Sequence, residues 1–401
     1  MNEPKKIYMD YNATTPIRPE VKESLIESFD LYGNPSSLHT PGRLATEKII
    51  EARINIAKLI NAEPDEIIFT AGGSESNNTV LKYVVCSPNK GCSGGCCSKA
   101  GRDQVITTAI EHPSIISTME FIKEQGGTPV ILGVDSKGKI DLKELEESIT
   151  DKTALISVMM ANNEIGTIQD IKKIAQIGKK HGVLVHSDAV QAAGKIPIDV
   201  KDLGVDYLSL SGHKIYAPKG IGILYARRKA PYCPFIHGGH QESGRRAGTL
   251  NNLGIIGFGR AAELALKEID TEYITMQGLR DRLKAGILKS VPDITINGHE
   301  TDVLPNTLNV SFAGAEGESI LLYLDMEGIA VSTGSACSSD SLEPSQVLLA
   351  IGLGPELAHG SIRFSLGREN TENDVDYVIE KLPPIIAKIR KMSTVYAGGK
   401  R

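Results

Sequence analysis

The sequence contains no apolar run long enough to cross a membrane. Its longest apolar stretches are strand-sized, well short of the ~18–20 residues that a membrane-spanning helix needs. The opening segment MNEPKKIYMDYNATT has no apolar signal region, so we expect a cytoplasmic protein whose thiols are reduced. An excess of positive charge is also absent, because 44 basic and 49 acidic residues give a net charge of −5. This balance gives no reason to expect nucleic acid or a membrane as a partner.

Two familiar phosphate-binding motifs are missing as well. There is no Walker loop and no GxGxxG fingerprint, and the run GIIGFG at 254–259 has the wrong spacing for a dinucleotide site. Internal repeats and extended low-complexity segments are not found. The 401 residues are 41% hydrophobic and 23% charged, which is ordinary for a globular protein and enough for two domains.

The middle of the sequence alternates short apolar runs with helix-like segments. Examples of the apolar runs are EIIFT, QVITT, ALISV, VLVHS and YLSLS. This alternation predicts βαβ units and a mostly parallel seven-stranded sheet flanked by helices. After about residue 262 the pattern changes, which predicts a smaller α+β domain. We therefore expect a large domain at 16–262 and a small domain formed by 1–15 and 263–401.

Two polar segments follow apolar strands and carry candidate catalytic groups. SLSGHKIYAPKG (209–220) places Lys214 after a strand, where a lysine can form a Schiff base with an aldehyde cofactor or can simply be a surface charge. HSDAVQAAG (186–194) ends a strand at Asp188, whose buried carboxylate needs a cationic partner such as a pyridinium nitrogen. The ordinary alternative for Asp188 is a helix N-cap.

Two further segments have the same position relative to strands. In TAGGSESNN (70–78), Gly73 and Ser74 begin a helix whose N–H groups can bind a phosphate, although an N-capped turn would look alike. In AIEHPS (109–114), His112 precedes a helix-starting proline and is either a loop histidine or one that stacks on a cofactor. Parallel strands end at one sheet edge, so these groups should meet there. Together they fit pyridoxal 5′-phosphate.

One cysteine lies in an unusual setting. Cys337 is surrounded by small polar residues in STGSACSSDSLEPS (332–345), which predicts a mobile loop where a structural cysteine would prefer an apolar run. The alternative is an inert free thiol. Cys86, Cys92, Cys96 and Cys97 crowd into a second Gly/Ser-rich loop, and Cys233 in APYCPF is interpreted as a packing residue.

Across almost its whole length, the chain resembles the cysteine desulfurases of the NifS/IscS type, which are class V aminotransferases with the pyridoxal-phosphate fold type I. The resemblance rests on the following motifs: YMDYNATTP, NPSSLH, TAGGSESNN, EHPS, MANNEIG, HSDAVQAAGK, LSLSGHKIYAPKGIG, RRAGTLN, STGSACSSDSLEPS and SIRFSLGR. It implies an α/β fold with the large domain expected at 16–262 and the small domain expected at 1–15 and 263–401.

The resemblance also implies a role for each matching residue. Lys214 matches the lysine that binds the cofactor covalently and moves the substrate proton. The resemblance implies that His112 stacks on the cofactor ring, with Asp188 at the ring nitrogen and Gln191 at the ring hydroxyl, and that Asn163 lies near the ring and the substrate. The residues it implies at the phosphate are Gly73, Ser74, Ser211 and His213. Thr249 is implied to reach the phosphate from the other subunit of a homodimer. Arg363 matches the arginine that holds the substrate carboxylate.

The implied reaction converts L-cysteine to L-alanine. Cys337 matches the nucleophile that takes the substrate sulfur as a persulfide, and loop mobility would let it carry that sulfur onward. The long form of this loop resembles the branch that supplies an iron–sulfur scaffold protein, and by analogy Cys337 could be a transient cluster ligand. Rival hypotheses are a selenocysteine lyase, an aminotransferase that needs no Cys337, and a non-catalytic scaffold.

The sequence departs from the family pattern in two places. Ser74 stands where the family usually has threonine, and its hydroxyl is retained. The segment 84–103 is longer than usual and carries the four crowded cysteines. Cys₄ ligation suits zinc or an iron–sulfur cluster, but adjacent ligands at Cys96 and Cys97 are awkward, so an unordered loop or a sulfur relay stays open.

Overall fold

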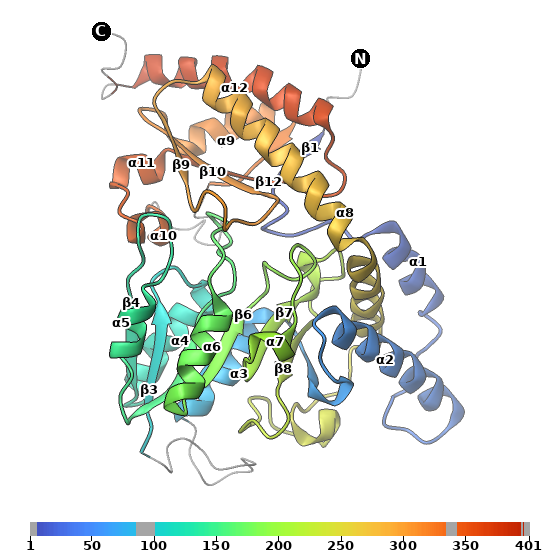
Figure 1. Cartoon of the computed structure of the whole chain (residues 1–401). Coiled ribbons are helices and arrows are strands. Elements are labelled where there is room, and N and C mark those ends of the chain that lie inside the picture. Colours follow the sequence, from blue (N-terminus) through green and yellow to red (C-terminus); the bar gives the residue numbers. More distant parts are fainter. Residues whose placement is uncertain (1–5, 86–100, 334–342, 394–395, 397–401) are drawn as a thin grey trace.

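The computed structural model describes residues 6–85, 101–333, 343–393 and 396. Its centre is a seven-stranded sheet (Figure 1). In spatial order its strands are β2 (Ile67–Thr70), β8 (Gly222–Ala226), β7 (Tyr207–Ser211), β6 (Leu184–Asp188), β5 (Thr153–Ser157), β3 (Gln104–Thr108) and β4 (Thr128–Leu132). Only β8 runs antiparallel to its neighbours, so the expected mostly parallel sheet is confirmed.

Helices cover the sheet because most of its strands are buried on both faces and their apolar side chains need partners. These helices are α1 (Pro19–Glu27), α2 (Thr40–Leu59), α3 (Gly73–Lys82), α4 (Pro113–Glu124), α5 (Leu142–Glu147), α6 (Ile171–His181) and α7 (Val200–Leu203). The apolar face of α6 buries Ile171, Ile174 and Ala175, and its lysines face outward. The helix ends where Gly182 adopts the left-handed conformation, with φ 63°.

A second apolar core lies at the other end of the molecule, shown at the top of Figure 1. It surrounds an antiparallel sheet of β12 (Ser361–Ser365), β10 (Thr307–Phe312) and β9 (Ile294–Asn297), and the parallel pair β1 (Ile7–Tyr8) and β11 (Ile329–Ala330). Its helices are α9 (Gly317–Met326) and α12 (Glu372–Met392), while α10 (Gln346–Ala350) and α11 (Pro355–His359) bury apolar side chains in a separate cluster with Ile110, Met159 and Ile165. The α+β character expected after residue 262 is therefore present.

A single long helix, α8 (Asn252–Ser290), joins the two cores. Its first half buries Ile255 and Phe258 in the core of the large sheet, and its second half buries Leu283 and Ile287 in the other core. The predicted helix at 263–290 is thus the C-terminal part of a longer one. Because α8 runs unbroken through position 262, the domain boundary placed there stays a prediction.

None of the described helices combines enough length with enough apolar character to span a membrane.

Candidate active site

The candidate residues gather at one edge of the large sheet. Strands β2, β3, β5, β6 and β7 point the same way, so their carboxyl ends lie together. Asp188 and Ser211 are the last residues of β6 and β7, and Lys214 closes the short 3₁₀ turn after β7. His112 lies between β3 and α4, and Gly73 begins α3 just after β2. The sequence had predicted this convergence.

Asp188 is a buried carboxylate whose described partners are neutral. Its Oδ2 accepts a hydrogen bond from Asn77 Nδ2 at 2.7 Å, and its Oδ1 accepts one from the backbone N–H of Val190 at 2.9 Å. Within the described residues, no lysine or arginine forms an ion pair with it. A buried carboxylate without a cation is costly, and a protonated pyridine nitrogen would supply the missing charge.

His112 is tied to Asp188 through two side chains. Its Nδ1 lies 2.9 Å from Ser114 Oγ and also accepts the backbone N–H of Ser114, so His112 caps α4. Ser114 Oγ in turn accepts from Asn77 Nδ2 at 3.0 Å. Burial, helped by the charge of Lys214, lowers the pKa of His112 although Asp188 opposes the shift. His112 is therefore a neutral ring at pH 7, suited to stack on an aromatic cofactor.

Lys214 is directed by backbone carbonyls of the N-terminal segment. Its Nζ donates to the carbonyl oxygens of Asn12 at 2.5 Å and Ala13 at 2.7 Å. Its neighbour His213 contacts Thr14 Oγ1 at 3.1 Å. Burial and nearby lysines lower the pKa of His213 to about 4, so this ring is neutral at pH 7 and can donate one hydrogen bond to a phosphate.

The turn before α3 is shaped for close approach of an anion. The helix begins after Gly72 with no side-chain cap, so its first N–H groups are available to a ligand. Gly72 has φ 156°, and a Cβ on Gly222 would come within 2.6 Å of the Gly72 Cα atom. Ser74 is exposed beside this turn, and Ser211 is buried against it. An uncapped helix start with two hydroxyls fits a phosphate group.

Arg363 is buried on β12 and faces the large sheet. Its Nη2 donates to Asp10 Oδ1 at 2.7 Å, and its Nη1 donates to the carbonyl oxygen of Asn163 at 3.1 Å. Its Nε is buried without a hydrogen-bond partner in the described chain. The guanidinium therefore has an N–H donor, on Nε, without a described partner. It lies beside Asn163, the residue that the family resemblance places near the substrate.

Cys337 lies outside the described residues, but both flanks of its segment are described. On one flank, the backbone of Ser332 exchanges hydrogen bonds with the backbone of Arg363. On the other, Ser345 Oγ donates to a carboxylate oxygen of Glu164, the residue after Asn163. The segment that carries Cys337 thus starts and ends at the candidate substrate position.

Thr249 is the candidate that does not join the group. It is exposed, and it lies after the turn in which Arg246 pairs with Glu75. That ion pair fixes the turn beside α3. An exposed position is what a residue reaching a partner subunit would have, so its role stays a prediction.

The sequence reasoning missed several residues that hold the site. Asn77 links Asp188 to Ser114, and only its place on the buried side of α3 could have signalled this. Asn12 provides the carbonyl for Lys214 and donates through Nδ2 to the carbonyl of Asn163. Glu111 is buried, which raises its pKa to about 8, and accepts hydrogen bonds from Thr108 and the Met159 N–H.

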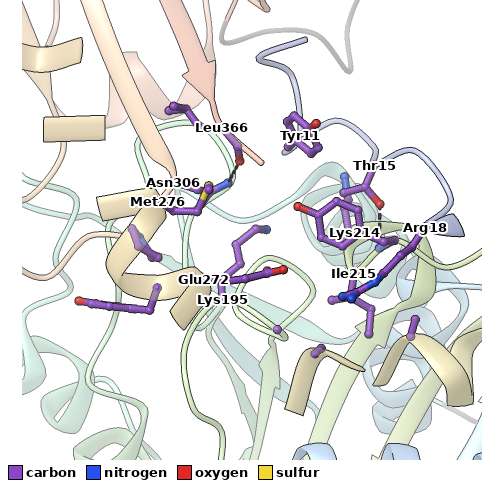
Figure 2. Close-up of a pocket in the computed structure, with 16 residues that line it drawn as sticks. Tyr11, Thr15, Arg18, Lys195, Lys214, Ile215, Glu272, Met276, Asn306 and Leu366 are labelled. Carbon is purple, nitrogen blue, oxygen red and sulfur yellow. Dashed lines mark hydrogen bonds between the residues drawn. The ribbon is translucent and has the colours of Figure 1, made fainter. Parts of the chain in front are cut away.

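A small cavity adjoins Lys214 between the two cores (Figure 2). Arg18, Lys195 and Glu272 line it together with Lys214. The volume open to water-sized molecules is ≈ 30 Å³, which is room for water and too little for a cofactor. Of the predicted cofactor contacts, Lys214 lines it and Asp188 does not, so this cavity is not the cofactor site itself.

The cysteine predictions have separate outcomes. Cys233 packs against apolar residues as expected, but it is also disulfide-bonded. The interpretation as a packing residue missed this bond, and the expectation that the thiols are reduced is wrong for Cys233. Its partner and the 86–97 cysteine loop lie outside the described residues. Among the residues that are described, no group of three or more His, Cys, Asp or Glu side chains could hold a metal ion.

Comparison with known proteins decides the family. The aminotransferase class-V model matches residues 7–378. The chain belongs to this family. A cysteine desulfurase IscS from Clostridium botulinum is 46% identical over 395 residues, covering 98% of this chain and 97% of that protein. These findings confirm the resemblance seen in the sequence and the cofactor, pyridoxal 5′-phosphate.

Two solved structures confirm the fold. A NifS-like protein aligns with a TM-score of 0.87 at 39% identity, covering 96% of this chain and all of that one. A structure of SspA in complex with cysteine aligns with a TM-score of 0.77 at 34% identity, covering 90% and 99%. The predicted α/β fold with a mostly parallel seven-stranded sheet is correct.

Proposed function

We propose that this chain is a pyridoxal-phosphate-dependent cysteine desulfurase that converts L-cysteine to L-alanine and keeps the sulfur on Cys337. One observation carries the proposal. The described flanks of the Cys337 segment meet the candidate substrate position, at Arg363 and at Glu164 beside Asn163. An aminotransferase would have no need for a cysteine there. The IscS relatives and the SspA structure with cysteine support the same substrate.

Each described group has a task in this reaction. Arg363 binds the substrate carboxylate, since its buried Nε has an unused donor. Bound pyridoxal 5′-phosphate supplies an electron sink for the pair of the breaking Cα–H bond. Lys214 Nζ accepts that proton, and Asp188 stabilises positive charge on the ring nitrogen. His112, neutral through burial, covers the ring face without adding a competing charge.

The sulfur then passes to Cys337. Its thiolate attacks the sulfur of the substrate, so that an S–S bond forms while the substrate Cβ–S bond breaks. The substrate sulfur is oxidised and its carbon reduced, because the bonding pair stays on Cβ, which takes up a proton. Lys214 Nζ returns its proton to Cα, alanine leaves, and Cys337 carries a persulfide. A scaffold protein of iron–sulfur assembly is the acceptor we propose, with Cys337 as a transient cluster ligand.

The decisive experiment is a single turnover of the purified, cofactor-loaded protein with L-cysteine. Wild type should release one alanine per site and gain the mass of one sulfur on Cys337. Cys337→Ala should retain the cofactor spectrum and lose both products, because the nucleophile is gone. An equally active variant would point to a lyase or aminotransferase, and a wild-type protein that binds no cofactor would point to a scaffold.

We also propose that the chain works as a homodimer. Large apolar side chains are exposed on and between α1 and α2, among them Phe29 (66% exposed), Tyr32 (82%) and Leu38 (90%). A monomer rarely leaves such a group in water. Covering it with a second copy would also explain why Thr249 is exposed in one chain.

Charges placed on this face should separate the dimer. For Tyr32→Glu combined with Leu38→Asp, sedimentation velocity should show a monomer, and cofactor retention should fall because Thr249 of the partner is lost. The matched control is Leu322→Asp, which charges another exposed apolar residue on α9. A double variant that remains dimeric would place the interface elsewhere.

The cytoplasmic location stays a prediction.

A further inference from the structure

Lys195 contacts Gln191, one of the predicted cofactor residues, and has no role in the proposed reaction. Its Nζ donates to both oxygens of Gln191, the backbone carbonyl and side-chain Oε1, each at 3.0 Å. In the described part of the chain, no carboxylate forms an ion pair with it. Burial, and then the charges of Lys214 and Arg363, lower the pKa of Lys195 to about 7. A partly buried lysine without an acidic partner is costly and asks for an explanation.

Two contacts fix which way the amide of Gln191 faces. Charged Lys195, the form that prevails below its pKa of about 7, can only donate hydrogen bonds, so the atom of Gln191 that faces it must be the oxygen Oε1. The donor Nε2 then points the opposite way, where it lies 2.9 Å from the carbonyl oxygen of Asn12. That same carbonyl accepts from Lys214 Nζ. Lys195 and the Asn12 carbonyl thus hold the amide from opposite ends, and removing Lys195 takes away one of these two restraints.

We propose that Lys195 is a positioning residue that holds the Gln191 amide with its N–H donor toward the ring hydroxyl oxygen of the cofactor. This proposal rests on the proposed function and on the contact with that oxygen which the family resemblance implies for Gln191. Lys195 acts through Gln191 and does not touch the reacting atoms. Lys195 and Lys214 both line the adjoining cavity, which has room for water beside the ammonium group (Figure 2).

The test measures cofactor binding in a double-mutant cycle. Wild type, Lys195→Met, Gln191→Ala and the double variant are prepared without cofactor, and the dissociation constant and visible absorbance band are measured as pyridoxal 5′-phosphate is added. Methionine keeps the length of lysine and removes its donors. Lys195→Met should weaken binding about tenfold, as one oriented hydrogen bond is worth about 1.5 kcal/mol. Its band should match that of Gln191→Ala.

The double variant decides whether Lys195 acts through Gln191. Because Lys195 acts through Gln191, adding Lys195→Met to Gln191→Ala should change neither affinity nor band. Multiplying effects, or a Lys195→Met protein that binds as wild type does, would overturn it. Thermal unfolding of the cofactor-free proteins and an exposed control, Lys179→Met, check that folding and net charge are not responsible. If the wild type itself binds no cofactor, the proposed function is wrong. If only the positioning role of Lys195 is wrong, the wild type still binds cofactor, so the two outcomes are distinguishable.

Discussion

Replacing Lys214 with alanine is expected to stop alanine release from L-cysteine. The variant loses both the covalent attachment of the cofactor and the base that removes the substrate proton. General acid–base groups contribute ~10²–10⁴-fold to rates, so the loss should be at least of this size. Two backbone carbonyls direct the Lys214 ammonium group, whereas the neighbouring Lys195 is bound to Gln191.

The measurement pairs product formation with the visible spectrum. Lys214→Ala should bind cofactor reversibly and lose the band of the covalently bound form, while its far-UV circular dichroism stays native. Lys143→Ala is the control, since this lysine is exposed on α5 and should leave both readouts unchanged. Normal alanine release by the Lys214 variant would contradict the assignment.

Replacing Asp188 with asparagine is the second change with a large expected effect. It removes the charge that pairs with the cofactor ring nitrogen and keeps the shape of the side chain. A pair of opposite charges ~4 Å apart at an effective dielectric constant of ~20 is worth ~4 kcal/mol, so the turnover rate should fall ~10²–10³-fold. Asn77 would then face an amide in place of a carboxylate, which it can still contact.

The Asp188 variant has a distinctive signature. Because the lost charge acts on the electron sink, the turnover rate should fall far more than the affinity for L-cysteine, which depends on Arg363. Steady-state kinetics and the dissociation constant of a cysteine analogue separate the two. Asp151→Asn is the control, as this carboxylate is exposed. Equal losses in rate and affinity would mean that Asp188 shapes the substrate pocket instead.

Much of this architecture follows from local patterns in the sequence. Near-continuous apolar runs predict buried parallel strands, and the sheet has them at β3, β5, β6 and β7. The predicted cofactor residues Asp188 and Ser211 end strands of the large sheet, and His112 and Lys214 lie in the short segments that follow strands. Strand direction alone brings such residues to a common edge. The fold class and the main cofactor contacts could therefore be stated from sequence.

What the sequence could not supply are contacts between segments far apart in the chain. Arg363 meets Asp10 across 353 residues, and Lys214 meets Asn12 across 202. The length of α8 was also underestimated, because its first half packs on one core and its second half on the other. No local pattern encodes such pairings.

The sequence by itself determined the kinds of group available: a lysine, a carboxylate, a histidine, a glycine-rich helix start and a cysteine among small residues. Tertiary structure decided their surroundings. It buried Asp188 beside neutral donors, and it placed Gln191 Nε2 against the carbonyl oxygen of Asn12, 179 residues away in the chain. The physical reason is that hydrogen-bond direction and charge screening depend on which segments pack together, and packing is settled only when the whole chain folds.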